Sequence, residues 1–245
     1  FIHLENLMKN GIILCSGGID SITTAHYVRE KLKYGKIIIL FFDYNQKALK
    51  SERKFSKMCA KKLHAKFYKI KLKWLGKTSN SLINKSGEIK NIKRKELKNA
   101  KKESEKFYVP CRNLIFLSHT LALAESLFAK EKKKWDIFVG FKNEGRESYP
   151  DTTKGFVSQI NKLAKLCSAA LEIKAPLINK DKEDIISLGK KLGVDFRNTF
   201  SCYIGKKKHC GYCLACRLRQ EGFYWANVKD PTEYNVKMKD FRLAK

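Results

Sequence analysis

The sequence GIILCSGGIDS, residues 11–21, predicts a strand, a tight loop and the start of a helix. Its first five residues form a short apolar run, which ends at the loop Ser16-Gly17-Gly18. Apolar residues then recur at helical spacing, at Ile22, Ala25, Val28 and Leu32. A strand that leads through a glycine-containing loop into a helix is the ligand-binding unit of doubly wound α/β folds.

The chain continues this alternation of strands and helices up to about residue 195. Residues 37–42 form a continuous apolar run, typical of a strand that is buried on both faces, and a third strand is predicted at 67–72. A charged helix is predicted after the second strand and ends at residue 63. The remaining pattern predicts helices at 113–128, 154–171 and 181–192, and a strand at 135–141. We therefore predict a doubly wound α/β domain over residues 1–195, with a five-stranded parallel sheet and right-handed crossovers.

Two segments do not follow this alternation. Residues 73–106 are rich in Lys, Asn, Ser and Glu and have few large apolar side chains, so we expect a basic insertion outside the core. Residues 196–245 are too few to bury a core of their own, so we expect a bound metal to stabilise a small C-terminal subdomain.

Composition limits the classes of partner. With 245 residues, 43% of them hydrophobic, the chain can bury a sizeable core. The net charge of +28 favours polyanions, but only nine of the 52 basic residues are arginines, the side chain that reads base edges, so we expect no nucleic-acid partner. The longest apolar run, 37–42, is far shorter than the roughly 20 residues of a membrane helix, and we expect a cytoplasmic protein.

Four of the eight cysteines lie within 15 residues, at Cys202, Cys210, Cys213 and Cys216. Four thiolates suit tetrahedral Zn²⁺ and leave no coordination position open, so a zinc ion here is expected to be structural. Gly211 permits the tight turn between two of the ligands. An iron–sulfur cluster is the alternative, because cysteine ligation alone does not select the metal. His209 is surplus to the set, and we expect it at the surface or behind the ligands.

The loop after the first strand predicts an anion site. Backbone N–H groups of such a turn converge on one point, and the dipole of the following helix favours negative charge there. Ser16 and Ser21 can donate further hydrogen bonds to phosphate oxygens. Neither the Walker pattern nor the dinucleotide fingerprint is present. The alternative interpretation is a tight turn with a Ser or Asp helix cap.

Residues 16–21 resemble the SGGxDS signature, or PP-loop, of N-type ATP pyrophosphatases, whose domain is Rossmann-like and of the adenine nucleotide α-hydrolase type. Together with the cysteine cluster, Pro110-Cys111-Arg112-Asn113, Tyr149-Pro150-Asp151 and the stretch from Pro176 to Gly189, this loop resembles the 7-cyano-7-deazaguanine synthase family. The resemblance implies a carbon–nitrogen ligase of the queuosine precursor pathway. Such an enzyme uses two ATP with Mg²⁺ and ammonia to convert 7-carboxy-7-deazaguanine to the nitrile through an amide, releasing AMP and pyrophosphate. It also implies a homodimer.

The resemblance assigns roles to single residues. The implied ATP-binding set is Cys15, Ser16, Gly17, Gly18, Ile19, Asp20, Ser21, Asp43, Gln46, Arg112, Asn113 and Gly140. The implied catalytic set is Asp20, Ser21, Arg112 and Lys182, and the implied substrate set is Glu147, Tyr149 and Asp151. From spacing alone, Asp43 could instead cap the following helix, Arg112 could form a surface ion pair, and Lys182 could be solvated.

The sequence departs from the family pattern around residues 145–153 and after Asp43, where it reads Tyr44-Asn45-Gln46-Lys47-Ala48. The resemblance therefore supports adenylation and leaves the acceptor open. A tRNA base or a protein group is one alternative; sulfur transfer to tRNA would need thiols outside the zinc set, and we expect Cys111 and Cys167 to be packing residues instead. A basic zinc-knuckle protein that binds nucleic acid is the alternative without enzymatic activity.

Overall fold

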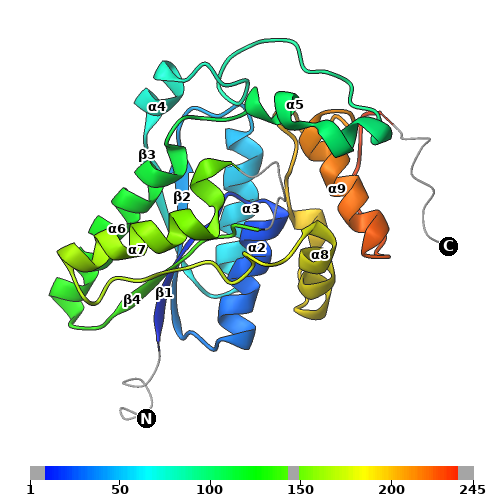
Figure 1. Ribbon diagram of the computed structural model, residues 1–245. Helices are drawn as coiled ribbons and strands as arrows, with labels where there is room; N and C mark the ends of the chain where they lie inside the picture. Colours follow the sequence, from blue (N-terminus) through cyan, green and yellow to red (C-terminus); the bar gives the residue numbers. More distant parts are fainter. Residues whose placement is uncertain (1–8, 143–148, 237–245) are drawn as a thin grey trace.

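The computed structural model describes residues 9–142 and 149–236, and it confirms the predicted five-stranded parallel sheet. The strands are β1 (Asn10–Leu14), β2 (Lys36–Asp43), β3 (Lys66–Lys71), β4 (Trp135–Phe138) and β5 (Ile173–Lys174), in the order β3-β2-β1-β4-β5. β1 pairs in parallel with both β2 and β4, so the strand order reverses beside β1 (Figure 1). In doubly wound sheets, ligands bind at this switch point, outside the carboxyl ends of the strands.

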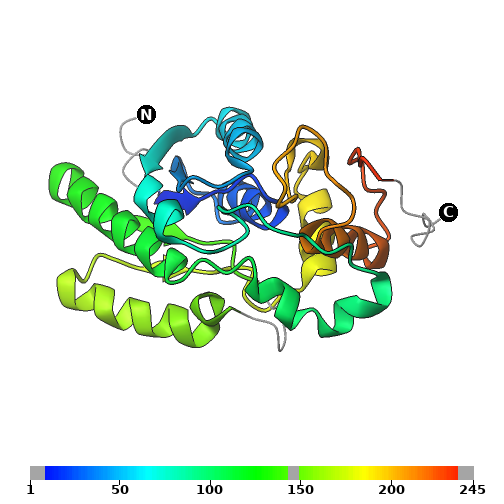
Figure 2. The same ribbon diagram turned by 90° about the horizontal axis from the view of Figure 1, so that it is seen from above.

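Helices cover both faces of the sheet (Figures 1 and 2). The core on one face packs against α6 (Arg112–Glu131) and α7 (Lys154–Cys167), and the core on the other against α2 (Ile19–His26), α3 (Leu49–Lys62) and α8 (Lys182–Lys191). Neighbouring residues of β1 illustrate the alternation, since Ile12 joins the first core and Ile13 the second. A π-helical turn at Tyr27–Lys31 extends α2.

The basic segment at 73–106 is not separate from the core, and that expectation is wrong. It forms α4 (Lys73–Thr78), a 3₁₀ turn at Arg94–Asn99 and α5 (Lys101–Glu105). Leu75 and Ile83 are buried in the same core as α6, and Ile92 is buried against Leu214. These apolar residues stand in short, widely separated groups such as Trp74-Leu75 and Leu82-Ile83, so neither composition nor periodicity indicates their burial.

The C-terminal segment is built on α9 (Leu214–Trp225), which lies beside α8 (Figure 1). Arg219 on α9 is fully buried, and its guanidinium donates to Thr199 Oγ1 at 2.7 Å and to the carbonyl oxygen of Phe196 at 3.1 Å. It also pairs with Asp230 at 3.4 Å. Arg219 therefore connects α9 to the 3₁₀ turn Phe196–Asn198 before it and to the chain after it.

Several predicted boundaries shift by a few residues. β4 ends at Phe138 rather than at residue 141. α7 ends at Cys167 rather than at residue 171, because the next residue, Ser168, has an extended backbone. β5 contains only two residues, too few for any periodic signal. Within the residues that the structure describes, no helix combines the length and apolar character needed to cross a membrane.

Candidate active site and metal centre

The loop between β1 and α2 is held between two backbone segments. Gly17 has φ of 81°, and a Cβ there would lie 2.6 Å from the carbonyl oxygen of Glu52 on α3. A Cβ on Gly140, which follows β4, would lie 3.0 Å from backbone atoms of Asp20 and Ser21. Both positions need glycine because the backbone approaches closely on each side. Gly18 precedes α2 without a side-chain cap, so the interpretation of the loop as a Ser or Asp cap is wrong.

A cavity of about 350 Å³ lies against this loop, in the size range of small-molecule sites. Most of the predicted ATP-binding residues line it, namely Cys15, Ser16, Gly18, Ile19, Asp20, Ser21, Gln46, Arg112, Asn113 and Gly140. Lys182 and Tyr149 line it as well. Gly17 and Asp43 are not on its wall, and Glu147 lies outside the described residues. The fold thus brings the predicted residues from six separate segments to one place.

Asp20 and Lys182 form a close ion pair across two helices. The Nζ atom of Lys182, the first residue of α8, lies 2.7 Å from both carboxylate oxygens of Asp20 on α2. The two side chains are only 20% and 25% exposed. Lys182 is therefore a partly buried, paired cation, and the interpretation of it as a solvated lysine is wrong.

Arg112 begins α6 and points its charge into the cavity wall. Its guanidinium lies 5.8 Å from the centre of the Tyr44 ring, and the residue before it, Cys111, has a left-handed backbone with φ of 54°. Among the described residues Arg112 forms no ion pair with a carboxylate, so a surface ion pair does not explain its position. A cation in this wall can stabilise negative charge inside the cavity.

Asp151 supports the start of α6 from behind. Its carboxylate accepts a hydrogen bond from the backbone N–H of Asn113 at 3.1 Å, and its carbonyl oxygen accepts one from the Asn113 side chain at 3.3 Å. Asp151 is 6% exposed and is not among the residues on the cavity wall. Asp43 is equally buried off the wall, and α3 begins only at Leu49, so Asp43 is not its cap.

Sequence reasoning missed Glu52, on the first turn of α3. Glu52 lines the cavity, and its Oε2 atom accepts a hydrogen bond from Gln46 Nε2 at 2.9 Å. Burial raises the pKa of Glu52 to about 7, although the hydrogen bond from Gln46 and the charge of Arg112 act in the opposite direction. In the sequence Glu52 stands among Lys, Ser and Arg, and nothing there distinguishes it from a solvent-exposed residue.

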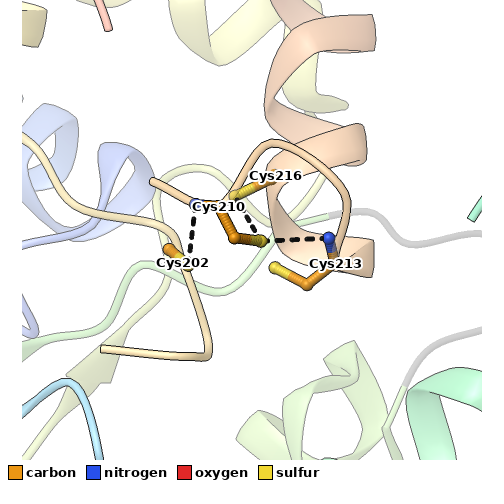
Figure 3. A group of neighbouring side chains, drawn as sticks. All are labelled: Cys202, Cys210, Cys213 and Cys216. Atoms are coloured by element: carbon orange, nitrogen blue, oxygen red, sulfur yellow. Dashed lines mark hydrogen bonds between the residues drawn. The ribbon is translucent and has the colours of Figure 1, made fainter. Parts of the chain in front are cut away.

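The four clustered cysteines converge as predicted (Figure 3). Their sulfur atoms all lie within 4.8 Å of one another, and those of Cys210 and Cys216 are 3.8 Å apart. Tetrahedral Zn²⁺ with Zn–S bonds of about 2.3 Å places its ligands about 3.8 Å apart, so the donor set fits such an ion. Backbone N–H groups of Tyr212 and Cys213 donate to the Cys210 sulfur at 3.4 and 3.2 Å. The cluster can therefore hold one metal ion.

His209 and the remaining cysteines differ in part from expectation. His209 is 5% exposed and lies behind the ligands, where its Nε2 accepts a hydrogen bond from the backbone N–H of Ser201 at 3.0 Å. The surface alternative is therefore wrong for His209. Cys111 and Cys167 are both exposed, so the expectation that they are packing residues is also wrong, whereas Cys15 and Cys59 are buried.

The chain matches the family described as "Queuosine biosynthesis protein QueC" over residues 10–227. It is 35% identical to the 7-cyano-7-deazaguanine synthase of Methanobrevibacter smithii over 94% of this chain and 99% of that protein. It is 36% identical to the enzymes of the same name from Methanosphaera stadtmanae and Rickettsia bellii, in each case over 93% of this chain and 99% of the relative. A family match over most of the chain and full-length relatives at this identity agree, and the chain belongs to the QueC family of 7-cyano-7-deazaguanine synthases.

Proposed function

We propose that this protein is an ATP-dependent ligase that converts 7-carboxy-7-deazaguanine and ammonia to 7-cyano-7-deazaguanine, with release of AMP and pyrophosphate. The observation that carries the proposal is the single cavity in which the SGGxDS loop, the Asp20–Lys182 pair and Arg112 meet. Family membership supports the choice of substrate, because its relatives carry the name of this enzyme.

The chemistry explains why a phosphate site and cations are needed together. A carboxylate has a poor leaving oxygen, and transfer of AMP to that oxygen lets ammonia displace it. A second adenylation, now on the amide oxygen, allows the oxygen to leave and the nitrile to form. In both steps negative charge develops on the departing pyrophosphate, and fixed donors that face this charge lower the barrier.

The described residues divide this work. We assign the loop amides and Ser16 and Ser21 to the ATP phosphates, and Arg112 and Lys182 to the charge of the departing pyrophosphate. Asp20 would hold Mg²⁺, which neutralises phosphate charge when it is bound. Gly17 and Gly140 set the loop in place, and Asp151 positions Asn113. Asp43 lies behind the wall, and we propose that it positions the turn around Gln46.

Aromatic side chains also line the cavity, among them Tyr44, Phe107, Phe116, Tyr149 and Tyr203. Tyr149 donates a hydrogen bond from its hydroxyl to the carbonyl oxygen of Ser104 at 2.8 Å, and its ring stacks on that of Tyr108 with the ring centres 5.4 Å apart, so the ring is held in the wall. Flat rings suit a planar heterocycle such as a deazapurine. We propose Tyr149 as a substrate contact and keep Glu147 in the same proposed set.

We further propose that the cysteine cluster holds structural Zn²⁺. Phe200, Ser201, Tyr203 and Ala215 lie on the cavity wall and are close in sequence to the cysteine ligands. A metal ion that fixes these segments would therefore fix one side of the cavity. We also propose a homodimer, for which the exposed Leu163 and Leu166 of α7 offer an apolar contact.

The test is product analysis by mass spectrometry of the metal-loaded protein with ATP, Mg²⁺, ammonium and 7-carboxy-7-deazaguanine. We expect the nitrile, AMP and pyrophosphate. If AMP forms only when tRNA or a protein acceptor is supplied, the proposed acceptor is wrong although adenylation stands. If RNA is bound without ATP turnover, the protein is a nucleic-acid binder and not a ligase.

A further inference from the structure

Glu52 is built into the wall beside the phosphate loop. Its own carbonyl oxygen is the atom that a Cβ on Gly17 would meet at 2.6 Å, so the first turn of α3 lies against the loop. One turn further along α3, Ser56 Oγ donates to the carbonyl oxygen of Cys15 at 2.9 Å and fixes α3 to the end of β1. These contacts place the carboxyl group of Glu52 at the edge where the proposed reaction occurs.

Gln46 fixes the orientation of this carboxyl group. Its side-chain oxygen accepts from the backbone N–H of Tyr44 at 3.0 Å, and its Nε2 donates to Phe42 at 3.0 Å and to Glu52 Oε2 at 2.9 Å. Across the residues that the structure describes, the other oxygen, Oε1, receives no hydrogen bond from the protein. One oxygen of Glu52 is thus held, and the second is available to a ligand in the cavity.

The proposed reaction needs a base near the nitrogen atom. Ammonium must lose a proton to become a nucleophile, and it loses another as the amide forms. The amide nitrogen loses its last two protons as the adenylated intermediate forms and as the C–O bond to AMP breaks to give the nitrile. One ammonium ion therefore gives up all four of its protons, and a positioned base can accept them.

The described part of the cavity wall contains only two carboxylic acids, Asp20 and Glu52, and no histidine. Both carboxylate oxygens of Asp20 already accept a hydrogen bond from Lys182 at 2.7 Å, whereas one oxygen of Glu52 accepts none from the described residues. The other charged residues of the described wall, Arg112, Lys142, Lys182 and Arg219, are cations. Glu52 is therefore the described wall residue best suited to accept protons from a cationic or neutral nitrogen.

We propose that Glu52 is the catalytic base of both half-reactions, a role that rests on the proposed function. In the first, its carboxylate takes a proton from ammonium, the nitrogen lone pair attacks the adenylated carbon, and the C–O bond to AMP breaks. In the second, the amide oxygen bonds to the α-phosphorus of ATP as pyrophosphate leaves. Glu52 then removes N–H protons while C≡N forms and AMP departs. Between steps it returns each proton to solvent.

The electrostatic surroundings of Glu52 agree with this role. Burial raises its pKa to about 7, and a base whose pKa lies near the working pH accepts protons most effectively. The titratable or charged side chains on the described part of the same wall are Cys15, Asp20, Tyr44, Arg112, Lys142, Tyr149, Lys182, Tyr203 and Arg219, and Asp43 is buried off the wall. Deprotonation is required for the base, so the rate should rise with pH up to about 7 and level off above it.

The experiment compares E52Q with the wild type in two assays. Substrate-dependent exchange of pyrophosphate into ATP reports adenylation, and mass spectrometry reports amide and nitrile. We expect E52Q to keep exchange within a few-fold and to lose about 10²–10⁴-fold in nitrile formation, the usual contribution of a general base. The pH-dependent rise of kcat below about 7 should be absent in E52Q and partly restored in E52D. E131Q, the same change at the far end of α6, is the matched control and should behave as wild type.

We do not expect E52Q to lose nitrile formation through unfolding. Because the pKa of Glu52 is raised by burial, its ionisation destabilises the folded state as the pH rises through about 7. Glutamine removes that cost, so E52Q should unfold at pH 8 no earlier than wild type. Equal nitrile formation by E52Q and wild type, or parallel loss of exchange and product in E52Q, overturns the role of Glu52. A wild type that exchanges pyrophosphate but makes no nitrile overturns the proposed function itself.

Discussion

Asp20 and Lys182 are the charged pair on which the proposed phosphate chemistry depends most directly. Their positions could be predicted only in part from the sequence. The SGGxDS motif identified Asp20, but the motif says nothing about its partner, which is 162 residues away. Only the family resemblance implied a role for Lys182, and only the structure shows that its side chain is partly buried. The sequence did not predict Glu52 as a site residue, because its surroundings are formed by β1, the loop and Gln46 rather than by its sequence neighbours.

Lys182→Met tests the role of this pair. The variant removes a cation that we propose faces the departing pyrophosphate, so we expect kcat to fall about 10²–10³-fold, as it does when one preorganised donor is lost. Steady-state kinetics at saturating ATP measure the change. Lys190→Met, on the exposed part of the same helix, is the control and should keep its rate. A Lys182→Met variant with unchanged kcat would exclude the lysine from the chemistry.

Gly17→Ala separates backbone strain from steric contact in the loop. Gly17 and Gly193 both have positive φ, but a Cβ meets the Glu52 carbonyl at 2.6 Å in the first case and nothing within 4 Å in the second. We expect Gly193→Ala to cost about 1 kcal/mol in the free energy of unfolding, with activity retained. Gly17→Ala should in addition lower kcat/KM about 10²-fold by displacing the loop. Chemical denaturation and kinetics of both variants give the comparison, and equal behaviour would remove the argument for close packing.

Secondary-structure elements with strong local patterns were predicted well, and those defined by distant contacts were not. β1, β2 and α2 have continuous or helical apolar patterns, and the structure places them within a few residues of expectation. The segment at 73–106 has no such pattern, yet Ile83 and Ile92 are buried against residues far along the chain. The cysteine cluster was predicted in part. Its spacing predicts a metal site, but only the structure shows that it lies beside the cavity wall.

Metal removal should affect the C-terminal segment first. The proposed zinc ion replaces a core that residues 196–236 are too few to form, so its loss should unfold them while the sheet persists. We expect one zinc per chain by elemental analysis. After chelation, hydrogen exchange should accelerate over residues 200–236, with β1 and β2 still protected. Cys213→Ser should show the same pattern without a chelator. Iron in place of zinc, or unchanged exchange after metal loss, would contradict a structural zinc site.

The residues that line the cavity are spread along the chain from Leu14 to Arg219. The loop after β1, the turn before α3, the start of α6, the end of β4, the start of α8 and the segments around the cysteines all contribute to its wall. The parallel sheet explains this convergence, because the carboxyl ends of its strands meet at one edge. The sequence could predict that edge as the site. It could not predict which side chains of the long basic segment, such as Ile83, line the cavity.

The transfer of oxygen from substrate to AMP tests the central claim most directly. The carboxylate of 7-carboxy-7-deazaguanine would be labelled with ¹⁸O in both oxygens, and the AMP formed with ATP, Mg²⁺ and ammonium would be weighed by mass spectrometry. If the protein adenylates first the carboxylate and then the amide, each AMP carries one ¹⁸O, and two labelled AMP form per nitrile. Unlabelled AMP, or label in pyrophosphate or phosphate instead, would contradict adenylation of this substrate in the cavity.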